Sequence, residues 1–269
     1  MRLRRDDVCR SCADRIEKGT EAYWDEDARN VTCLRCLGEV DLNRIDLSKV
    51  DCREIDRGDP GASAVREHRR RRANREARTR SRHPLIGRAI IALSGSPQHE
   101  RAWVTGGHGE QIVGRSLDRR TAKGPTMILH DRRMPRSRAN IDHLAIAPSG
   151  VYVIDTKAIA GRVRVSRPLF GKPMLTVKGR HRPKLVAGLE WQVDAVRRAL
   201  AESDHGDIAV FGVLCFTKAD LPRFGAGQIR GVRLHHCRAT ARKLNRSGPC
   251  SRETIEQITQ MLGRAFPRA

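Results

Sequence analysis

The sequence predicts an α/β fold whose core elements follow the order α-β-β-β-α-β. Three observations predict it: two amphipathic stretches at helical spacing, several short apolar runs bounded by turn residues, and a small cysteine-containing segment before them. A chain of 269 residues has room for one sizeable core and one small satellite module. The expected division is 1–40 as the cysteine module, 41–100 as linker and Arg-rich segment, 101–220 as the main domain, and 221–269 as a C-terminal strand and helix.

The N-terminal module contains two Cys-x-x-Cys knuckles, Cys9-Arg-Ser-Cys12 and Cys33-Leu-Arg-Cys36, with a small hairpin expected between them. Four thiolates at this spacing predict a zinc-ribbon-like structural Zn²⁺ site, since so small a module cannot bury enough apolar surface unaided. Two disulfides or redox thiols are the alternatives. The start Met1–Asp7 lacks the apolar core of a secretory signal, which favours a reducing cytoplasm and therefore zinc.

A strongly basic segment follows a polar, turn-rich linker. Residues 64–83 hold nine arginines and two glutamates, in a chain whose formal net charge is +22. The segment favours a helix, but it has no apolar stripe and is expected to be solvated all round or partly disordered. It is either a soluble linker or an arm that binds the phosphates of a nucleic acid. The residues predicted to bind nucleic acid are Arg66, Arg69, Arg70, Arg71, Arg72, Arg75 and Arg78.

The first helix of the main domain is expected after Gly106-Gly107-His108-Gly109, where Ile112, Val113 and Leu117 recur at helical spacing. Glu110 leans toward the buried side of this helix. It is a candidate site residue, or simply an acid favoured by the dipole at a helix N-terminus. A strand at residues 127–131 follows.

The segment from Asn140 to Lys157 reads as two apolar strands joined by Pro148-Ser149-Gly150. Strand alternation puts Asp155 and Lys157 on one face. A two-residue loop at Pro148-Ser149 would set Asp142 opposite Asp155, whereas a three-residue loop would set it opposite Thr156. Paired carboxylates would hold a divalent metal and the lysine would face a phosphate, the minimum for metal-assisted phosphodiester hydrolysis. The alternative is a surface hairpin with acids at its ends.

The remaining elements complete the order. A second short hairpin is expected at residues 161–165 and 174–177, then a helix over 184–201 and a strand over 208–216. Gln192 falls on the apolar stripe of that helix, and because a buried amide needs partners, it is expected to point into a polar site. A tail helix over 252–264 has apolar residues spaced to pack on the main domain.

From about Trp103 to Phe216 the chain resembles the nuclease-related domain (NERD), a branch of the PD-(D/E)XK restriction-endonuclease-like superfamily. The matching pieces are Gly109-Glu110, Leu129-His130-Asp131, Asn140-Ile-Asp-His143, Gly150-Val-Tyr-Val-Ile-Asp-Thr-Lys157 and Gln192. The resemblance implies a restriction-endonuclease-like mixed sheet flanked by helices. It also implies that Asp142 and Asp155 bind Mg²⁺, with Glu110 as a third carboxylate and Lys157 acting on the attacking water and the scissile phosphate. Many members carry Glu where this chain has Asp155.

The sequence therefore predicts a cytoplasmic nuclease that hydrolyses DNA with Mg²⁺ or Mn²⁺, through Glu110, Asp142, Asp155, Lys157 and Gln192. The alternatives are a nucleic-acid-binding protein with this fold that is silent or needs a partner, and a zinc-ribbon interaction adaptor. The glycines before Glu110 lack the Lys-Ser/Thr of a P-loop, so ATPase work has no support. The longest apolar run is far too short to span a membrane. No surface can be read from the sequence as a homo-oligomer interface.

Overall fold

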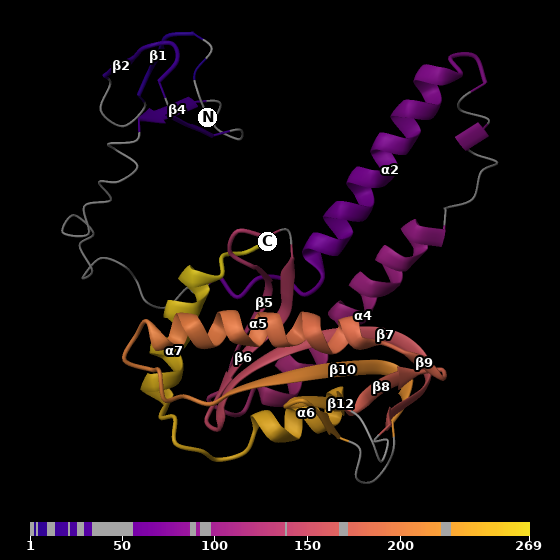
Figure 1. Cartoon of the computed structure of the whole chain (residues 1–269), viewed down its shortest axis with the longest axis vertical. Coiled ribbons are helices and arrows are strands. Elements are labelled where there is room, and N and C mark those ends of the chain that lie inside the picture. Colours follow the sequence, from indigo (N-terminus) through magenta and orange to yellow (C-terminus); the bar gives the residue numbers. More distant parts are fainter. Residues whose placement is uncertain are drawn as a thin grey trace. The chain divides into compact units, whose positions relative to one another are not determined.

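The computed structural model describes residues 3, 5–9, 14–20, 22–25, 30–33, 56–86, 90–91, 98–137, 139–166, 172–221 and 227–269. The chain divides into two compact units, Met1–Glu54 and Ile55–Ala269. The large unit contains the mixed sheet with helices on both sides that the sequence predicts (Figure 1).

The described residues of the small unit form two antiparallel hairpins. Strand β1 (Asp7–Val8) pairs with β2 (Arg15–Ile16), and β3 (Ala22–Asp25) pairs with β4 (Asn30–Cys33). Its core contains Leu3, Cys9, Ile16, Ala22 and Val31. The hairpin of β3 and β4 is the one expected between the two cysteine knuckles.

The main sheet of the large unit has the strand order β11-β12-β10-β7-β6-β5. Strands β5 (Met127–Arg133), β6 (Asn140–Ala147) and β7 (Gly150–Ser166) form an antiparallel meander. Strand β10 (Val210–Asp220) then joins β7 in parallel, and β12 (Val232–His236) joins β10 in parallel. The short strands β8 (Met174–Val177), β9 (Arg180–His181) and β11 (Gln228–Ile229) complete the sheet. Two parallel neighbouring strands need a crossover connection, and the one between β7 and β10 contains helix α5 (Pro183–Ala201).

Helices cover both faces of this sheet (Figure 1). Helices α5 (Pro183–Ala201) and α7 (Arg252–Ala265) contribute Leu189, Val196 and Ile258 to the larger core, together with Leu144 and Val153 of the sheet. On the opposite face, α4 (Gln98–Thr121) and α6 (Cys237–Leu244) pack over the alternate residues of the same strands. The period-2 alternation of β6 and β7 therefore divides their side chains between two cores.

Three details differ from the sequence-based expectations. The strands expected at residues 151–157 and 161–165 are one continuous strand, β7, because Gly161 (φ +100°) passes through the strand without ending it. Helix α4 begins at Gln98, ahead of the expected start. Within α4, Val113 and Leu117 are fully buried but Ile112 is 46% exposed, so it lies outside the apolar stripe.

The Arg-rich segment forms helix α2 (Ala62–Arg82), whose only buried residue is Ala64. Helix α2 packs near its start against α4, where Gly61 and Gly107 approach closely: a Cβ on Gly61 would lie 2.6 Å from the Gly107 carbonyl oxygen. Beyond this crossing the helix is largely exposed, as its sequence predicts. None of the described helices has the length and apolar character needed to cross a membrane.

Candidate active site

The β6–β7 hairpin has the register of the two-residue turn. Ala147 pairs with Gly150, and the ladder continues to His143 and Ile154. Gly150 suits this turn because its φ is +125° and a Cβ there would lie 2.4 Å from the Ala209 carbonyl oxygen. Continued by one residue, the same register sets Asp142 opposite Asp155, which is the arrangement required for paired carboxylates.

Asp142 lies at the point where the two strands begin to separate. Its Oδ2 accepts a hydrogen bond from the backbone N–H of Thr156 at 2.7 Å. A side chain of β6 thus takes the place of a main-chain acceptor and holds the carboxylate against β7. Burial, followed by the charges of Glu110 and Asp155, raises the pKa of Asp142 well above its usual range.

Lys157 lies on the same face of β7 as Asp155. Its Nζ is 2.6 Å from Asp155 Oδ1, and both side chains are mostly buried. Burial by itself would lower the pKa of Lys157, but Asp155, Asp142 and Glu110 together raise it above its usual value. Lys157 is therefore a fixed positive charge within a group of carboxylates at neutral pH.

Glu110 approaches this group from helix α4, next to Gly109. A Cβ on Gly109 would lie 2.9 Å from the Ala158 Cβ, so α4 crosses β7 just beyond Lys157. Burial, followed by the charges of Asp131 and Asp155, raises the pKa of Glu110 to about 7. The alternative of an acid placed only for a helix dipole is not favoured, because Glu110 lies well inside α4 and interacts with the strand carboxylates.

Gln192 extends from α5 toward the start of β6. Its Nε2 donates to the Asn140 carbonyl oxygen at 3.1 Å, and its Oε1 is buried with no hydrogen-bond partner among the described residues. A buried acceptor without a donor is unfavourable unless a ligand or water supplies one. That Gln192 points into a polar site stays a prediction.

The donor set suits a hard divalent cation. Glu110, Asp142 and Asp155 offer carboxylate oxygens, which are the ligands that Mg²⁺ prefers, and a cation would relieve the repulsion that raises the pKa of Asp142 and Glu110. As the side chains stand, no three Asp, Glu, His or Cys residues in the described part of the chain are close enough to bind an ion together. Lys157 Nζ instead neutralises one oxygen of Asp155.

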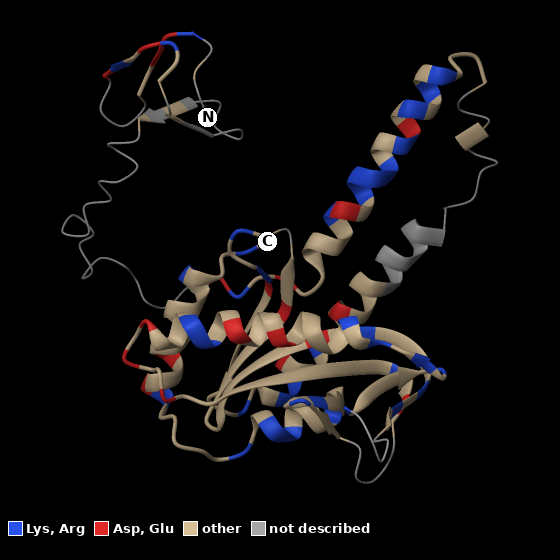
Figure 2. Cartoon of the chain, viewed as in Figure 1, with Lys and Arg blue, Asp and Glu red and all other residues tan. Residues whose placement is uncertain are grey.

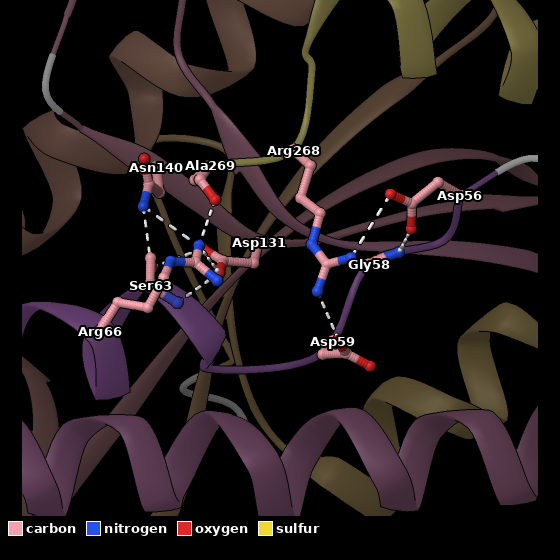
Figure 3. Close-up of polar contacts among 9 residues, drawn as sticks. All are labelled: Asp56, Gly58, Asp59, Ser63, Arg66, Asp131, Asn140, Arg268 and Ala269. Carbon is pink, nitrogen blue, oxygen red and sulfur yellow. Dashed lines mark hydrogen bonds and ion pairs between the residues drawn. The ribbon is translucent and has the colours of Figure 1, made fainter. Parts of the chain in front are cut away.

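Asp131 is a fourth carboxylate, which no pattern in the sequence marked as a site residue. The β5–β6 pairs His130–His143 and Arg132–Ile141 flank it, so the register sets Asp131 opposite Asp142. Its backbone adopts φ +52°, and its buried carboxylate accepts from Ser63 N and Ser63 Oγ, both at 2.6 Å (Figure 3). Asp131 therefore holds the start of α2 beside the other acids. The only local signal for Asp131 in the sequence was its place in Leu129-His130-Asp131 at the end of this strand. Its partner Ser63 lies 68 residues away, so no short-range pattern links the two.

Behind the acids, on the α4 face of the sheet, a buried hydrogen-bonded chain joins two histidines. Asp118 Oδ1 is 3.1 Å from His130 Nε2, and His130 Nδ1 is 2.9 Å from His143 Nδ1. His143 Nε2 is 3.2 Å from Thr156 Oγ1. Burial, followed by the charge of His130, lowers the pKa of His143 well below its usual value. This series of hydrogen bonds holds Thr156 in place, and the Thr156 backbone N–H in turn binds Asp142.

The seven arginines predicted to bind nucleic acid all lie on α2, and all but Arg75 are exposed. Arg70 and Arg71 pair with Glu67 at 2.7 and 2.5 Å, and Arg72 pairs with Glu76 at 2.8 Å. Arg66 differs from these, because its guanidinium is 3.6 Å from Asp131 Oδ2 and also contacts the Ala269 carbonyl oxygen (Figure 3).

Of the four proposed zinc ligands, Cys9 and Cys33 are described, whereas Cys12 and Cys36 lie outside the described residues. Cys9 is buried, and its Sγ accepts a hydrogen bond from the backbone N–H of Cys33 at 3.3 Å. The first cysteines of the two knuckles are therefore neighbours, as a shared metal would require.

Residues 105–217 match the family model of NERD, described as nuclease-related domain. The match spans most of α4 through β10 and contains all five residues predicted for the active site, whereas the cysteine module and α2 lie outside it. Comparisons with curated proteins and with solved structures found no match. A nuclease-related function is the general expectation from this family.

Proposed function

We propose that this protein is a metal-dependent nuclease of the PD-(D/E)XK type that hydrolyses phosphodiester bonds in DNA. The observation that supports the proposal is the hairpin register, in which the ladder that ends at His143 and Ile154 would, continued by one residue, set Asp142 opposite Asp155. Lys157 lies on the same face, and all three residues fall within the segment that matches the nuclease-related domain. The raised pKa values of Glu110 and Asp142 add support, because catalytic sites are where ionisable groups are so crowded.

Asp142, Asp155 and Glu110 would hold Mg²⁺ or Mn²⁺. When bound, the ion would activate water and neutralise charge that develops on the scissile phosphate. The backbone N–H of Thr156 keeps Asp142 directed into the site. The protonated Lys157 would leave Asp155 for the phosphate or the attacking water, and its positive charge would stabilise the more negative transition state. Gln192 Oε1 would accept from the water or from substrate.

The proposed partner is a nucleic acid, because the chain holds 53 basic and 31 acidic residues and concentrates nine arginines on α2. Phosphate contacts of this kind carry little sequence information and weaken steeply with salt. We further propose that the small unit is a structural Zn²⁺ module and that the protein works in the cytoplasm.

The deciding experiment incubates the full chain with linear, circular, single-stranded and branched DNA in Mg²⁺, Mn²⁺ or excess EDTA. The matched variants are Asp155→Asn and Asp194→Asn, the same change at a catalytic and at an exposed helical position. Cleavage that requires metal, disappears in Asp155→Asn and persists in Asp194→Asn would establish the nuclease. Lys157→Met should also abolish cleavage while low-salt binding remains.

A second candidate is a nucleic-acid-binding protein with the same fold that does not cleave alone. The ion pair between Lys157 and Asp155 favours it, since these side chains must move before a metal can bind. If the protein binds DNA without a metal ion and cleaves none of the substrates, this candidate is supported. The proposal that the protein cleaves DNA without a partner would then be refuted.

A further inference from the structure

Helix α2 is attached to the acid row, by which we mean Asp131, Asp142 and Asp155 at facing positions of β5, β6 and β7. The sequence of this segment alone would also allow a linker. Its N-cap residue Gly61 has no side chain that could accept from the first turn of the helix. The Ala62 N–H donates to the Asp59 carbonyl oxygen, but the Ser63 N–H needs an acceptor from elsewhere. Asp131 supplies one from β5, binding both the N–H and the hydroxyl of Ser63. A carboxylate here is also favoured by the helix dipole. Asn140 Nδ2, 2.9 Å from Ser63 Oγ, ties the same residue to β6 (Figure 3).

This attachment creates a basic cavity beside the candidate active site. The cavity has a volume of about 610 Å³ and lies between α2 and the ends of β5 and β6. Its lining includes four arginines and one glutamate, and the residues that matter here are Ser63, Arg66, Arg70, Arg71, Arg133 and Asn140. Asn140 is two residues before Asp142, and its carbonyl accepts from Gln192. The cavity therefore adjoins the acids.

A second cavity continues along the same helix. It measures about 580 Å³, and its lining includes Arg71, Asn74, Arg75, Arg78, Arg82 and His83. Arg71 lines both cavities, which follow one another along α2. The arginine-rich character of α2 is visible along its length in Figure 2. Arg69 and Arg80 line neither cavity, although they are exposed and lie on the same helix.

We propose that these two cavities form a track for the phosphate backbone of the nucleic-acid strand that enters the acid cluster. The track is defined by Arg66, Arg70, Arg71, Arg75, Arg78, Arg82 and Arg133. It rests on the proposed function for the identity of its ligand and adds where the strand lies. Six of its arginines come from a helix outside the segment that matches the nuclease-related domain.

The chemistry of the track suits phosphates rather than bases. Guanidinium groups bind phosphate oxygens through paired N–H donors, and arginine keeps its charge at every physiological pH. Glu67 holds Arg70 and Arg71 in ion pairs, so their positive ends are already arranged before a strand arrives. The hydrogen bonds between Ser63 and Asp131 fix the start of α2 beside the acid row. The fold therefore sets the distance from the track to the acids. The strand would be positioned for cleavage with little sequence preference.

The test compares two double variants that each remove two positive charges. Arg70→Ala/Arg133→Ala removes exposed arginines that line the first cavity, and Arg69→Ala/Arg80→Ala removes exposed arginines outside the track. Binding of a labelled DNA duplex to the full chain is measured by fluorescence anisotropy in EDTA, across a salt series. Equal melting temperatures establish that both variants are folded.

Loss of two phosphate contacts should reduce the salt slope of the track variant by about 1.8. On lowering the salt from about 200 to about 50 mM, the ratio of wild-type to variant affinity should then grow roughly tenfold. The control variant should keep nearly the wild-type slope. Equal changes in the two variants, or none in either, would overturn the track.

The assay needs no cleavage, so its result is separable from the proposed hydrolysis. A protein that cleaves DNA but shows no difference between the two variants would keep the nuclease and reject the track. A protein that shows the difference but never cleaves would keep the track and reject the hydrolysis. With cleavage, the track variant should raise KM and leave kcat near the wild-type value.

Discussion

Replacing Glu110 with glutamine should stabilise the metal-free protein at alkaline pH. The side chain keeps its size and hydrogen-bonding capacity but can no longer ionise. In the wild type, burial and the charges of Asp131 and Asp155 raise the pKa of Glu110 from 4.5 to about 7. The folded state therefore tolerates the ionised glutamate poorly, and the variant removes that ionisation.

The sign and size follow from proton linkage. A carboxyl group whose pKa is higher in the folded state contributes most to stability below pH 4.5, and this contribution is lost as the pH rises through about 7. The full shift corresponds to about 3 kcal/mol in the free energy of unfolding. Between about pH 5 and about pH 8, the stability of Glu110→Gln relative to wild type should increase by roughly 2–3 kcal/mol. For a domain of this size that is roughly 5–10 °C in Tm.

The assay is thermal unfolding of wild type and variant at both pH values, in buffer freed of divalent cations. Glu202→Gln is the matched control, since it makes the same change at an exposed glutamate. Added Mg²⁺ should narrow the gap at the higher pH, because the cation favours the ionised wild type. A Tm difference between Glu110→Gln and wild type that does not vary with pH would refute the crowded-carboxylate reasoning.

Two further predictions concern the anchor of α2 and the cysteine module. Asn at position 131 still tolerates positive φ, but Asp131→Asn removes the charge that Ser63 binds. The free energy of unfolding should fall by about 1–2 kcal/mol, and trypsin should cleave within α2 faster. Unchanged proteolysis would show that α2 is held elsewhere. Cys9→Ser should lose stoichiometric zinc in elemental analysis while Cys250→Ser keeps it, and zinc retained in Cys9→Ser would exclude the four-thiolate site.

Much of the fold followed from local patterns. The alternation of β6 and β7 and the turn residues between them predicted the hairpin, and the apolar stripe of 184–201 predicted α5 with its polar Gln192. The continuity of β7 through Gly161 was missed because glycine also ends strands, and only the pairing with β8 and β10 shows that this one does not. Likewise, Ile112 matched the helical spacing but lies beside the buried stripe.

The sequence by itself determined the chemistry that is available: two carboxylates and a lysine on one hairpin, a third carboxylate on a preceding helix, two cysteine knuckles, and an arginine-rich helix. These features depend on residue type and short-range spacing, which are fully present in the chain. Tertiary structure alone decided the hairpin register, the role of Asp131 as an anchor for Ser63, and the side of α2 that faces the acids. Each of these depends on contacts between distant segments, where competing arrangements are equally compatible with the local pattern and only packing selects one.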